Sequence, residues 1–157
     1  MARIASLREC KKFLPRRGGG KIVLVGGCFD ILHIGHARFL SEAKAMGDDL
    51  VVLLESDRNV RRLKGKNRPI FTQKQRAEML SSLRMVDLIV LLPSMDNDND
   101  YLNLVTKIKP EIIAVTEGDP QIEKKRRQAR KVGAVLRTIF ITKTFSTSKL
   151  AKILGVE

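Results

Sequence analysis

The sequence predicts an α/β fold, a Rossmann-like, doubly wound parallel sheet of about five strands with helices on both faces. Short runs of continuously apolar, often β-branched residues alternate along the chain with segments of helical periodicity. Such runs are typical of parallel strands, which are buried on both faces of the sheet. The length of 157 residues and the hydrophobic fraction of 43% suit one domain with one substantial core.

The first 20 residues are expected to lead into this domain. Residues 4–14 have the pattern of a short amphipathic helix, and the stretch RRGGGK at 16–21 has the composition of a linker. We therefore expect a lead-in helix and a glycine-rich linker within 1–20, followed by a single domain over 21–157.

Strands and helices are expected to alternate through this domain. The apolar runs predict strands at 21–26, 50–56, 87–92, 111–118 and 134–141. Helical patterns predict helices at 36–45, 101–108 and 121–132, one through residue 83 that opens with a Thr72–Gln75 capping box, and a last one capped by Ser146. Ligands of such sheets bind at the carboxyl ends of the strands, where the connections diverge.

The stretch GGCFDILHIGH, which begins at Gly26, follows the first predicted strand and opens the first predicted helix. Its first two glycines allow a ligand to approach the backbone closely, because no Cβ atom intervenes. The helix N-terminus offers unpaired N–H groups to a phosphate. His33 and His36, the only histidines of the chain, can direct two imidazole donors at one phosphate, with Gly35 leaving the space between them clear.

Other interpretations of this stretch remain open from the residues alone. One histidine could be a buried structural or capping group. A metal site is weakly supported, because two histidines lack a third ligand nearby, and we expect no metal held by protein ligands. Asp30 could contribute to a magnesium–triphosphate geometry or could brace the turn.

The formal net charge of +13 indicates anionic partners such as nucleotides, phosphosugars or nucleic acid. Basic residues cluster between 58 and 76 and again in EKKRRQARK at 123–131, where a solvated face is the simpler interpretation. A nucleic-acid-binding module is the alternative from another functional class. With six Phe, one Tyr, no Trp and no RNP-like or KH-like pattern, no base-stacking surface is evident, so nucleic acid is not the expected partner.

Composition also bears on location. No apolar run approaches the roughly 20 residues that span a bilayer, and the first residues contain no secretory-type apolar core. Two cysteines are too few for a disulfide framework. We expect a cytoplasmic protein that does not associate with membranes.

GCFDILHIGH (Gly27 to His36) resembles the G-x-F-D-x-x-H-x-G-H signature of the cytidylyltransferase-like nucleotidyltransferases. FSTSKL (Phe145 to Leu150) is similar to that family's second element, near the end of the chain. The resemblance covers 21–157 and implies one nucleotidyltransferase domain. It implies that an acceptor phosphate attacks the α-phosphorus of ATP or CTP, accompanied by Mg²⁺, with release of pyrophosphate.

The resemblance also assigns site residues. It implies that His33 and His36 are catalytic. The residues that it places at the nucleotide are Gly27, Cys28, Phe29, Asp30, Gly35, Gly118, Asp119, Ser146, Thr147, Ser148 and Lys149.

A finer resemblance concerns ESDRNVRRLKGKNRPIFTQKQR at 55–76, which looks like the corresponding stretch of bacterial heptose-phosphate adenylyltransferases. It implies that Lys64 and Arg76 are catalytic charges directed at phosphate. It further implies substrate-binding roles for Ser56, Asp57 and Arg68. This loop favours ATP over CTP and a sugar or polyol phosphate as acceptor, and relatives of this kind make a homodimer the default expectation.

The chain also departs from the family pattern. VTEGDP stands where the heptose enzymes have K-G-G-D-Y, the basic helix at 121–132 does not map onto the family pattern, and Lys143 stands where sister enzymes have arginine. The acceptor is therefore left open. The alternatives are cytidylyl transfer to glycerol 3-phosphate, adenylyl transfer to FMN, and a catalytically weak homologue that senses nucleotides.

Overall fold

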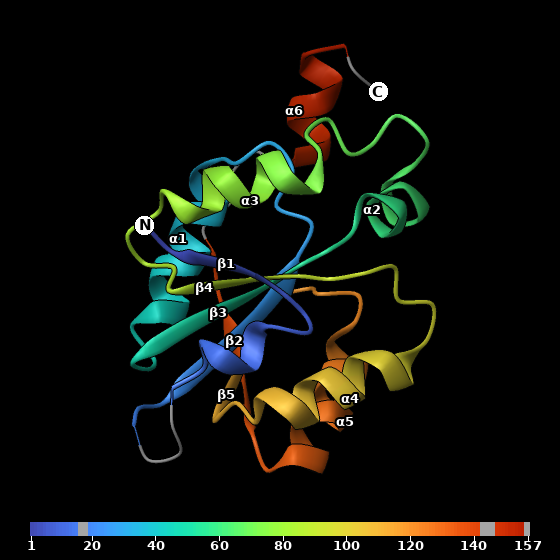
Figure 1. The fold of residues 1–157 in the computed structure, drawn as a ribbon. Coiled ribbons are helices and arrows are strands. Elements are labelled where there is room, and N and C mark those ends of the chain that lie inside the picture. The colour runs from blue at the N-terminus through green and yellow to red at the C-terminus, as the bar shows by residue number, and fades with distance from the viewer. Residues whose placement is uncertain (16–18, 142–146, 156–157) are drawn as a thin grey trace.

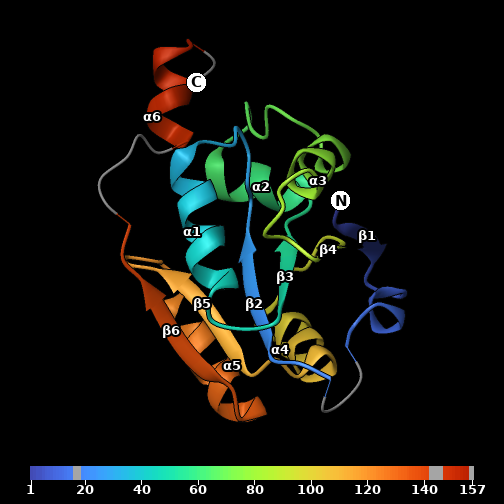
Figure 2. The same cartoon turned by 90° about the vertical axis from the view of Figure 1, so that its left-hand side faces the viewer.

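The computed structural model describes residues 1–15, 19–141 and 147–155. Within these ranges the chain forms a six-stranded, all-parallel sheet in the order β1-β4-β3-β2-β5-β6 (Figures 1 and 2). The strands are β1 (Arg3–Ser6), β2 (Ile22–Gly27), β3 (Asp49–Leu54), β4 (Leu88–Leu91), β5 (Ile112–Thr116) and β6 (Val135–Ile139). The helices are η1 (Cys10–Lys12, a 3-10 turn), α1 (Ile34–Lys44), α2 (Asp57–Lys64), α3 (Gln73–Ser81), α4 (Asp98–Ile108), α5 (Ile122–Val132) and α6 (Thr147–Ile153).

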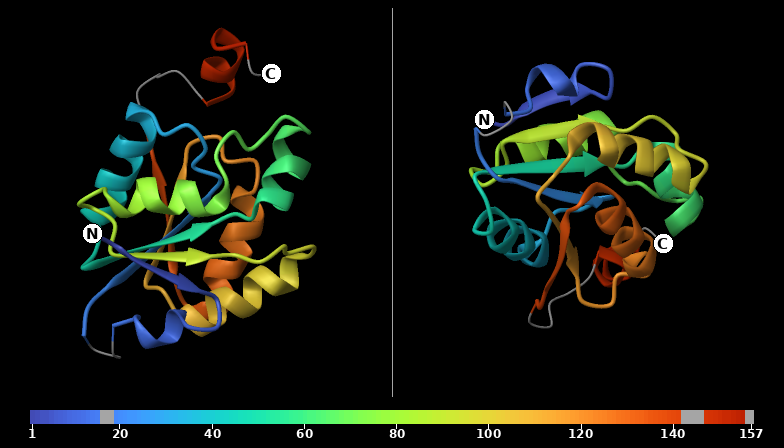
Figure 3. Two further views of the ribbon diagram at one scale, coloured as in Figure 1. Left: turned by 45° about the horizontal axis from the view of Figure 1, so that its top comes forward. Right: turned by 90° about the horizontal axis from the view of Figure 1, so that it is seen from below.

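The sheet is doubly wound about β2. From β2 the chain adds β3 and β4 on one side, and it then crosses back to add β5 and β6 on the other side. Figure 1 shows α1 and α3 on one face of the sheet and α4 and α5 on the opposite face, and the right-hand view of Figure 3 looks onto that second face. The predicted fold class is confirmed, and the order of strands reverses between β2 and β5.

The core lies in two layers because successive side chains of a buried strand point to opposite faces. In β2, Val23 and Val25 pack on the side of α1, in the same cluster as Leu40. Leu24 packs on the opposite side, in the same cluster as Leu104 of α4. Burial on both sides explains why the strands appear in the sequence as continuous apolar runs.

The predicted helix over residues 4–14 is wrong. Residues Arg3–Ser6 form β1, which pairs in parallel with β4, and a single 3-10 turn follows at Cys10–Lys12. Strand β4 would otherwise be an edge with unpaired backbone groups, and β1 satisfies them. Ala5 and Cys10 are buried in the core beneath α4. In the part of the chain that the structure describes, the sheet therefore has six strands, one more than expected.

Helix α2 was not expected from the sequence, which indicated only a basic loop between 58 and 76. Ser56 begins it as the N-cap, with its hydroxyl oxygen accepting the N–H of Asn59 at 3.2 Å. The predicted capping box of α3 is confirmed, since Thr72 accepts the N–H of Gln75 and the Gln75 side chain accepts the N–H of Thr72. Together α2 and α3 carry the basic loop past the carboxyl end of β3.

Candidate active site

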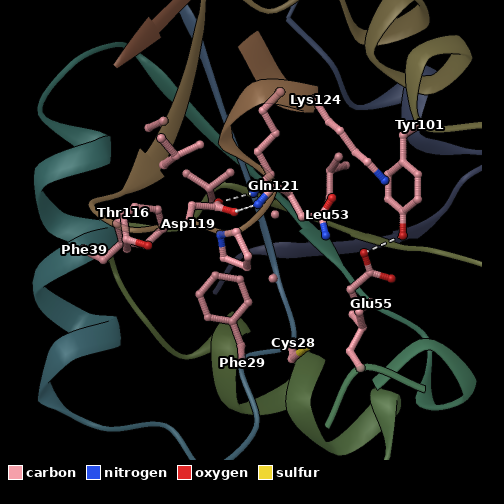
Figure 4. Close-up of a pocket in the computed structure, with 18 of the residues that line it drawn as sticks. Cys28, Phe29, Phe39, Leu53, Glu55, Tyr101, Thr116, Asp119, Gln121 and Lys124 are labelled. Atoms are coloured by element: carbon pink, nitrogen blue, oxygen red, sulfur yellow. Dashed lines mark hydrogen bonds and ion pairs between the residues drawn. The ribbon is translucent and has the colours of Figure 1, made fainter. Parts of the chain in front are cut away.

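A cavity of about 990 Å³ opens at the carboxyl ends of β2, β3 and β5, beside the point where the strand order reverses. Its wall comes from the β2–α1 connection, the end of α2, the β4–α4 loop, α4, the β5–α5 loop, α5 and the start of α6. Figure 4 shows Cys28 and Phe29 on one side of this cavity, with Glu55 and Tyr101 joined by a hydrogen bond on another. The cavity lies at the edge of the sheet where the sequence predicted ligand binding.

The turn from β2 into α1 is tightly packed and strained. A Cβ atom at Gly27 would lie 3.0 Å from the Phe29 ring, so a larger residue would displace that ring. Phe29 and Ile31 adopt left-handed backbone conformations, with φ of 47° and 52°, which residues with a Cβ rarely adopt. Strain of this kind collects at ligand-binding turns that the surrounding structure holds in place. Gly27 is thus needed for the packing of Phe29 as well as for access to the backbone.

The two histidines form one unit at the start of α1. His33 is the N-cap, and its Nδ1 accepts the N–H of Gly35 at 3.1 Å. The Nδ1 of His36 accepts the N–H of His33 at 3.4 Å. An Nδ1 atom that accepts a hydrogen bond leaves the proton of a neutral ring on Nε2. Both rings line the cavity with centroids 3.9 Å apart, so they present two Nε2–H donors side by side.

Both imidazoles are neutral at physiological pH. Burial lowers the pKa of His33 below its usual value. Burial also lowers the pKa of His36, to about 4, with the neighbouring His33 adding to the effect and Asp30 opposing it. The pair is therefore available as neutral hydrogen-bond donors and not as cations, and the catalytic role implied by the sequence stays a prediction.

Asp30 is buried beneath this turn, with 1% of its surface exposed. Its carboxylate accepts from Arg68 Nε at 2.8 Å and from the N–H groups of Ile70 and Phe71 at 2.9 and 3.1 Å. Both carboxylate oxygens thus already have protein donors, which supports the bracing interpretation over the magnesium one. Arg68, predicted to bind substrate, lines the cavity and at the same time anchors its own loop.

Arg76 does not line the cavity. It is 1% exposed, and its guanidinium donates to the carbonyl oxygens of Phe71, Cys28 and Glu55 and to Asp57 Oδ1, at 2.7 Å for the last. These contacts tie α3 to the ends of β2 and β3. The phosphate-directed role implied by the resemblance is therefore not what this geometry supports, and Arg76 is placed as a structural brace.

The other predicted site residues between 55 and 76 also divide into one that lines the cavity and two that do not. Lys64, the last residue of α2, is exposed and lines the cavity. Ser56 and Asp57 do not line it, because one caps α2 and the other is the ion-pair partner of Arg76. Of these three predicted site residues, the structure brings only Lys64 to the cavity.

The β5–α5 loop brings Gly118 and Asp119 to the cavity. Gly118 has a left-handed conformation, with φ of 74°. The Asp119 carboxylate accepts the N–H of Gln121 at 2.7 Å and the ammonium of Lys125 at 2.6 Å. Asp119 therefore orders the start of α5 and brings a lysine of that helix to the cavity.

The C-terminal element also reaches the site. Thr147 and Ser148 begin α6 and line the cavity, and the Thr147 hydroxyl donates to the carbonyl oxygen of Asp30 at 3.0 Å. Lys149 does not line the cavity and is exposed. Ser146 lies outside the described residues. The two sequence motifs, more than 100 residues apart, thus meet at the start of α1.

Sequence reasoning missed several residues of the wall. Glu55 and Tyr101 line the cavity, as do Lys124 and Lys125 of the basic helix. Glu55 could have been found, because it directly follows β3 at the same sheet edge as the histidine motif. Tyr101 offered no comparable signal. The two lysines belong to the charge cluster interpreted as a solvated face; Lys124 is indeed exposed, but both also line the cavity.

Among residues 1–15, 19–141 and 147–155, no three His, Cys, Asp or Glu side chains gather as a metal site requires. Within the same part of the chain, no helix combines the length and the apolar character needed to cross a bilayer.

The family model "Cytidylyltransferase-like" matches residues 24–151. A protein of Campylobacter concisus named bifunctional protein HldE is 47% identical over 111 residues, which are 71% of this chain and 23% of that protein. The protein of the same name from Coxiella burnetii (strain RSA 493 / Nine Mile phase I) is 42% identical over 140 residues, 87% of this chain and 28% of the relative. The chain thus spans about a quarter of the length of these curated relatives.

Among solved structures, the lipopolysaccharide core biosynthesis protein of Thermoplasma volcanium is 30% identical, with a TM-score of 0.65 over 81% of this chain and 100% of that one. A pantoate-beta-alanine ligase of Francisella tularensis, 16% identical with a TM-score of 0.61, covers 92% of this chain and 69% of its own and shares the fold. The resemblance inferred from GCFDILHIGH and FSTSKL is confirmed by the family model, which spans both segments. The chain belongs to the cytidylyltransferase-like family.

Proposed function

We propose that this chain is a nucleotidyltransferase that moves AMP from ATP to the phosphate of a sugar or polyol phosphate and releases pyrophosphate. The observation that carries the proposal is the pair of neutral imidazoles at a helix N-terminus, each accepting a backbone N–H at its Nδ1, with both residues lining one cavity. Donors fixed in advance stabilise charge that develops on a phosphoryl group without reorganising during the reaction.

The geometry supports transfer by positioning. The triphosphate lies between the start of α1, where the positive end of the helix dipole favours anions, and Thr147 and Ser148 of α6. An oxygen of the acceptor phosphate forms a bond to the α-phosphorus, and the bond from that phosphorus to the bridging oxygen breaks as pyrophosphate leaves. An ionised phosphate is already a nucleophile, so no protein base is required. The two Nε2–H groups and Lys64 bind the charged oxygens.

Adenylyl transfer is preferred to cytidylyl transfer because of the relatives. The bifunctional HldE proteins are 42–47% identical to this chain, and the sequence of the basic loop resembles heptose-phosphate adenylyltransferases. The Thermoplasma volcanium relative is named for lipopolysaccharide core biosynthesis. A heptose 1-phosphate is therefore the first acceptor to test.

Mg²⁺ enters this proposal with the triphosphate. Mg²⁺ commonly keeps several waters and binds through substrate phosphates, and it would supply neutralisation of their charge. The described residues fit that arrangement and not a protein-built cage, because the Asp30 carboxylate is already bonded to protein donors and no three metal-ligating side chains among them gather at one point. Cytoplasmic location and a homodimer stay predictions, and sedimentation measures the second.

A pyrophosphate-release screen tests the function. ATP and CTP are each offered with heptose 1-phosphate, glucose 1-phosphate, glycerol 3-phosphate and FMN, and we expect release with ATP and a sugar phosphate. Removing one preorganised donor typically raises the barrier by about 3 kcal/mol, or slows the reaction roughly 100-fold. The rate of pyrophosphate release by His33→Ala and by His36→Ala should therefore each fall by about that factor. Lys131→Ala, on the basic helix but outside the cavity lining, is the matched control. Release with CTP alone, or full turnover in both histidine variants, would refute the proposal.

A further inference from the structure

The wall of the cavity formed by the end of β3, α4 and α5 differs in charge from the wall that carries the histidines. Two basic side chains of α5 lie on it, and each contacts a carboxylate: Lys124 with Asp98 at 3.0 Å and Lys125 with Asp119 at 2.6 Å. Beside it, Arg62 of α2 contacts Asp96 at 3.6 Å. Paired in this way, the basic helix gives the cavity little net positive charge. A second phosphate group is therefore not what this wall accommodates.

Glu55 is the exception on this wall, since no cation of the described residues contacts it. It follows Leu54, the register partner of Gly27, and its N–H donates to the carbonyl oxygen of Gly27 at 3.1 Å. Neighbouring strands lie about 4.8 Å apart, so Glu55 begins one strand away from the glycine that opens the phosphate motif. An unpaired carboxylate in this position repels a phosphate and attracts neutral hydrogen-bond donors.

Among the described residues, the two hydrogen-bond partners of the Glu55 carboxylate are neutral donors. The Tyr101 hydroxyl donates to Oε1 at 2.6 Å, and the Asn59 amide nitrogen donates to Oε2 at 3.0 Å (Figure 4 shows the first). Burial raises the pKa of the Tyr101 phenol, and the bond to Glu55 raises it further, so the phenol remains protonated. Two carboxylate oxygens offer about four acceptor positions, so the two bonds leave capacity for donors in the cavity.

Asn59 holds this pair at a cost in its own hydrogen bonding. Its amide nitrogen is placed against Glu55, the Tyr101 oxygen and the carbonyl oxygen of Met95. Within the described ranges, its amide oxygen is buried with no hydrogen-bond partner. An unsatisfied buried acceptor costs about 1–3 kcal/mol, and such a group in a folded protein calls for an explanation. Positioning of the Glu55 carboxylate is the explanation that the contacts support.

We propose that Glu55 and Tyr101 recognise the hydroxyl groups of the acceptor and so determine its specificity, with Asn59 as their positioning residue. This inference rests on the proposed function. The acceptor lies with its phosphate toward His33 and His36 and its neutral polyhydroxyl body toward Glu55. The carboxylate accepts hydrogen bonds from the sugar hydroxyls, and its charge keeps the phosphate at the histidine end.

The test compares two acceptors in Glu55→Gln and Tyr101→Phe. Heptose 1-phosphate carries hydroxyl groups, and methyl phosphate carries none. Hydrogen bonds to charged groups are worth about 1.5–3 kcal/mol, or roughly 10- to 150-fold. We expect Glu55→Gln to lower kcat/KM for heptose 1-phosphate by about that factor and Tyr101→Phe by about 5-fold. The kcat/KM for methyl phosphate and the KM for ATP should stay within about two-fold of those of the unmodified chain, since neither involves these hydroxyl contacts.

Glu117→Gln is the matched control, because Glu117 follows β5 as Glu55 follows β3 but is exposed and outside the cavity lining. Equal losses with both acceptors would assign Glu55 a structural role and overturn the inference. An unchanged kcat/KM for heptose 1-phosphate in Glu55→Gln and Tyr101→Phe would overturn it as well. An unmodified chain that releases no pyrophosphate with any acceptor would instead refute the proposed function, and the inference with it.

Discussion

Arg76→Ala should destabilise the protein strongly, because the structure places this arginine in the interior of the molecule. The guanidinium is 1% exposed and donates to three backbone carbonyl oxygens and to Asp57. Removing it takes this donor away from three partly buried carbonyl oxygens and leaves Asp57 without its ion-pair partner. The resemblance to heptose-phosphate adenylyltransferases implies a different role, a charge directed at substrate phosphate, so this variant separates the two readings.

The expected loss of stability follows from the contacts. The Arg76 side chain is fully buried in this pair while Asp57 is 33% exposed. Removing one partner of a buried ion pair typically costs about 3–5 kcal/mol, and the loss of three hydrogen bonds to carbonyl oxygens offsets the partial exposure of Asp57. For a chain of this length, 1 kcal/mol corresponds to roughly 2–4 °C in Tm, so a decrease of about 6–20 °C is expected. Arg76→Lys should lose most of the same stability, because an ammonium cannot reproduce the planar fork that reaches three carbonyl groups.

Urea denaturation and thermal melting measure this loss, and ATP binding below the transition separates the roles. Lys64→Ala is the counterpart, an exposed cation at the cavity whose removal should change stability by less than about 0.5 kcal/mol while raising the KM for ATP or acceptor. A folded, fully stable Arg76→Ala protein with turnover reduced by orders of magnitude would refute the structural reasoning and restore the catalytic assignment.

Three further predictions follow from other parts of the structure. The pKa of His36 is about 4 in the folded protein, below the usual 6.5, so the unfolded chain takes up a proton first as the pH falls. The free energy of unfolding should therefore fall as the pH is lowered from 6.5 to about 4. In urea titrations at several pH values, His36→Gln should show a weaker dependence on pH. An identical dependence in the unmodified chain and in His36→Gln would contradict a buried, neutral His36. Lys64→Ala should lower kcat/KM more than Lys125→Ala, because the Lys125 ammonium is already bonded to Asp119; equal effects in a steady-state assay would make both lysines substrate ligands. Ala5→Asp should cost more than about 2 kcal/mol in urea denaturation, because Ala5 is buried in β1, whereas a solvent-exposed lead-in helix would tolerate it.

The sequence by itself determined the features that depend on local pattern. Continuous apolar runs such as 21–26 and 50–56 predicted parallel strands buried on both faces, and β2 and β3 occupy those positions. The histidine pair was placed correctly at the start of a helix because the motif, the preceding strand and the glycine lie within a few residues of one another. The Thr72–Gln75 capping box is equally local, and it was also found.

The tertiary structure alone decided which charged residues face the cavity. Arg76 and Lys64 look alike in a basic loop, yet one bonds to the carbonyl oxygen of Cys28, 48 positions away, and the other reaches the cavity. Glu55 becomes part of the site through Tyr101, 46 positions along the chain. Burial and hydrogen-bond partners are set by contacts between distant segments, which no local spacing encodes.

The N-terminus shows the same limit for the fold. Residues Arg3–Ser6 have too few apolar positions for the sequence to distinguish a strand from a helical turn. They become β1 because β4 presents an edge to pair with, and Arg3 is in register with Leu88, 85 positions further along the chain. Local pattern therefore determined the class of the fold and the phosphate motif. Long-range pairing determined the sixth strand, the internal role of Arg76 and the wall that faces the acceptor.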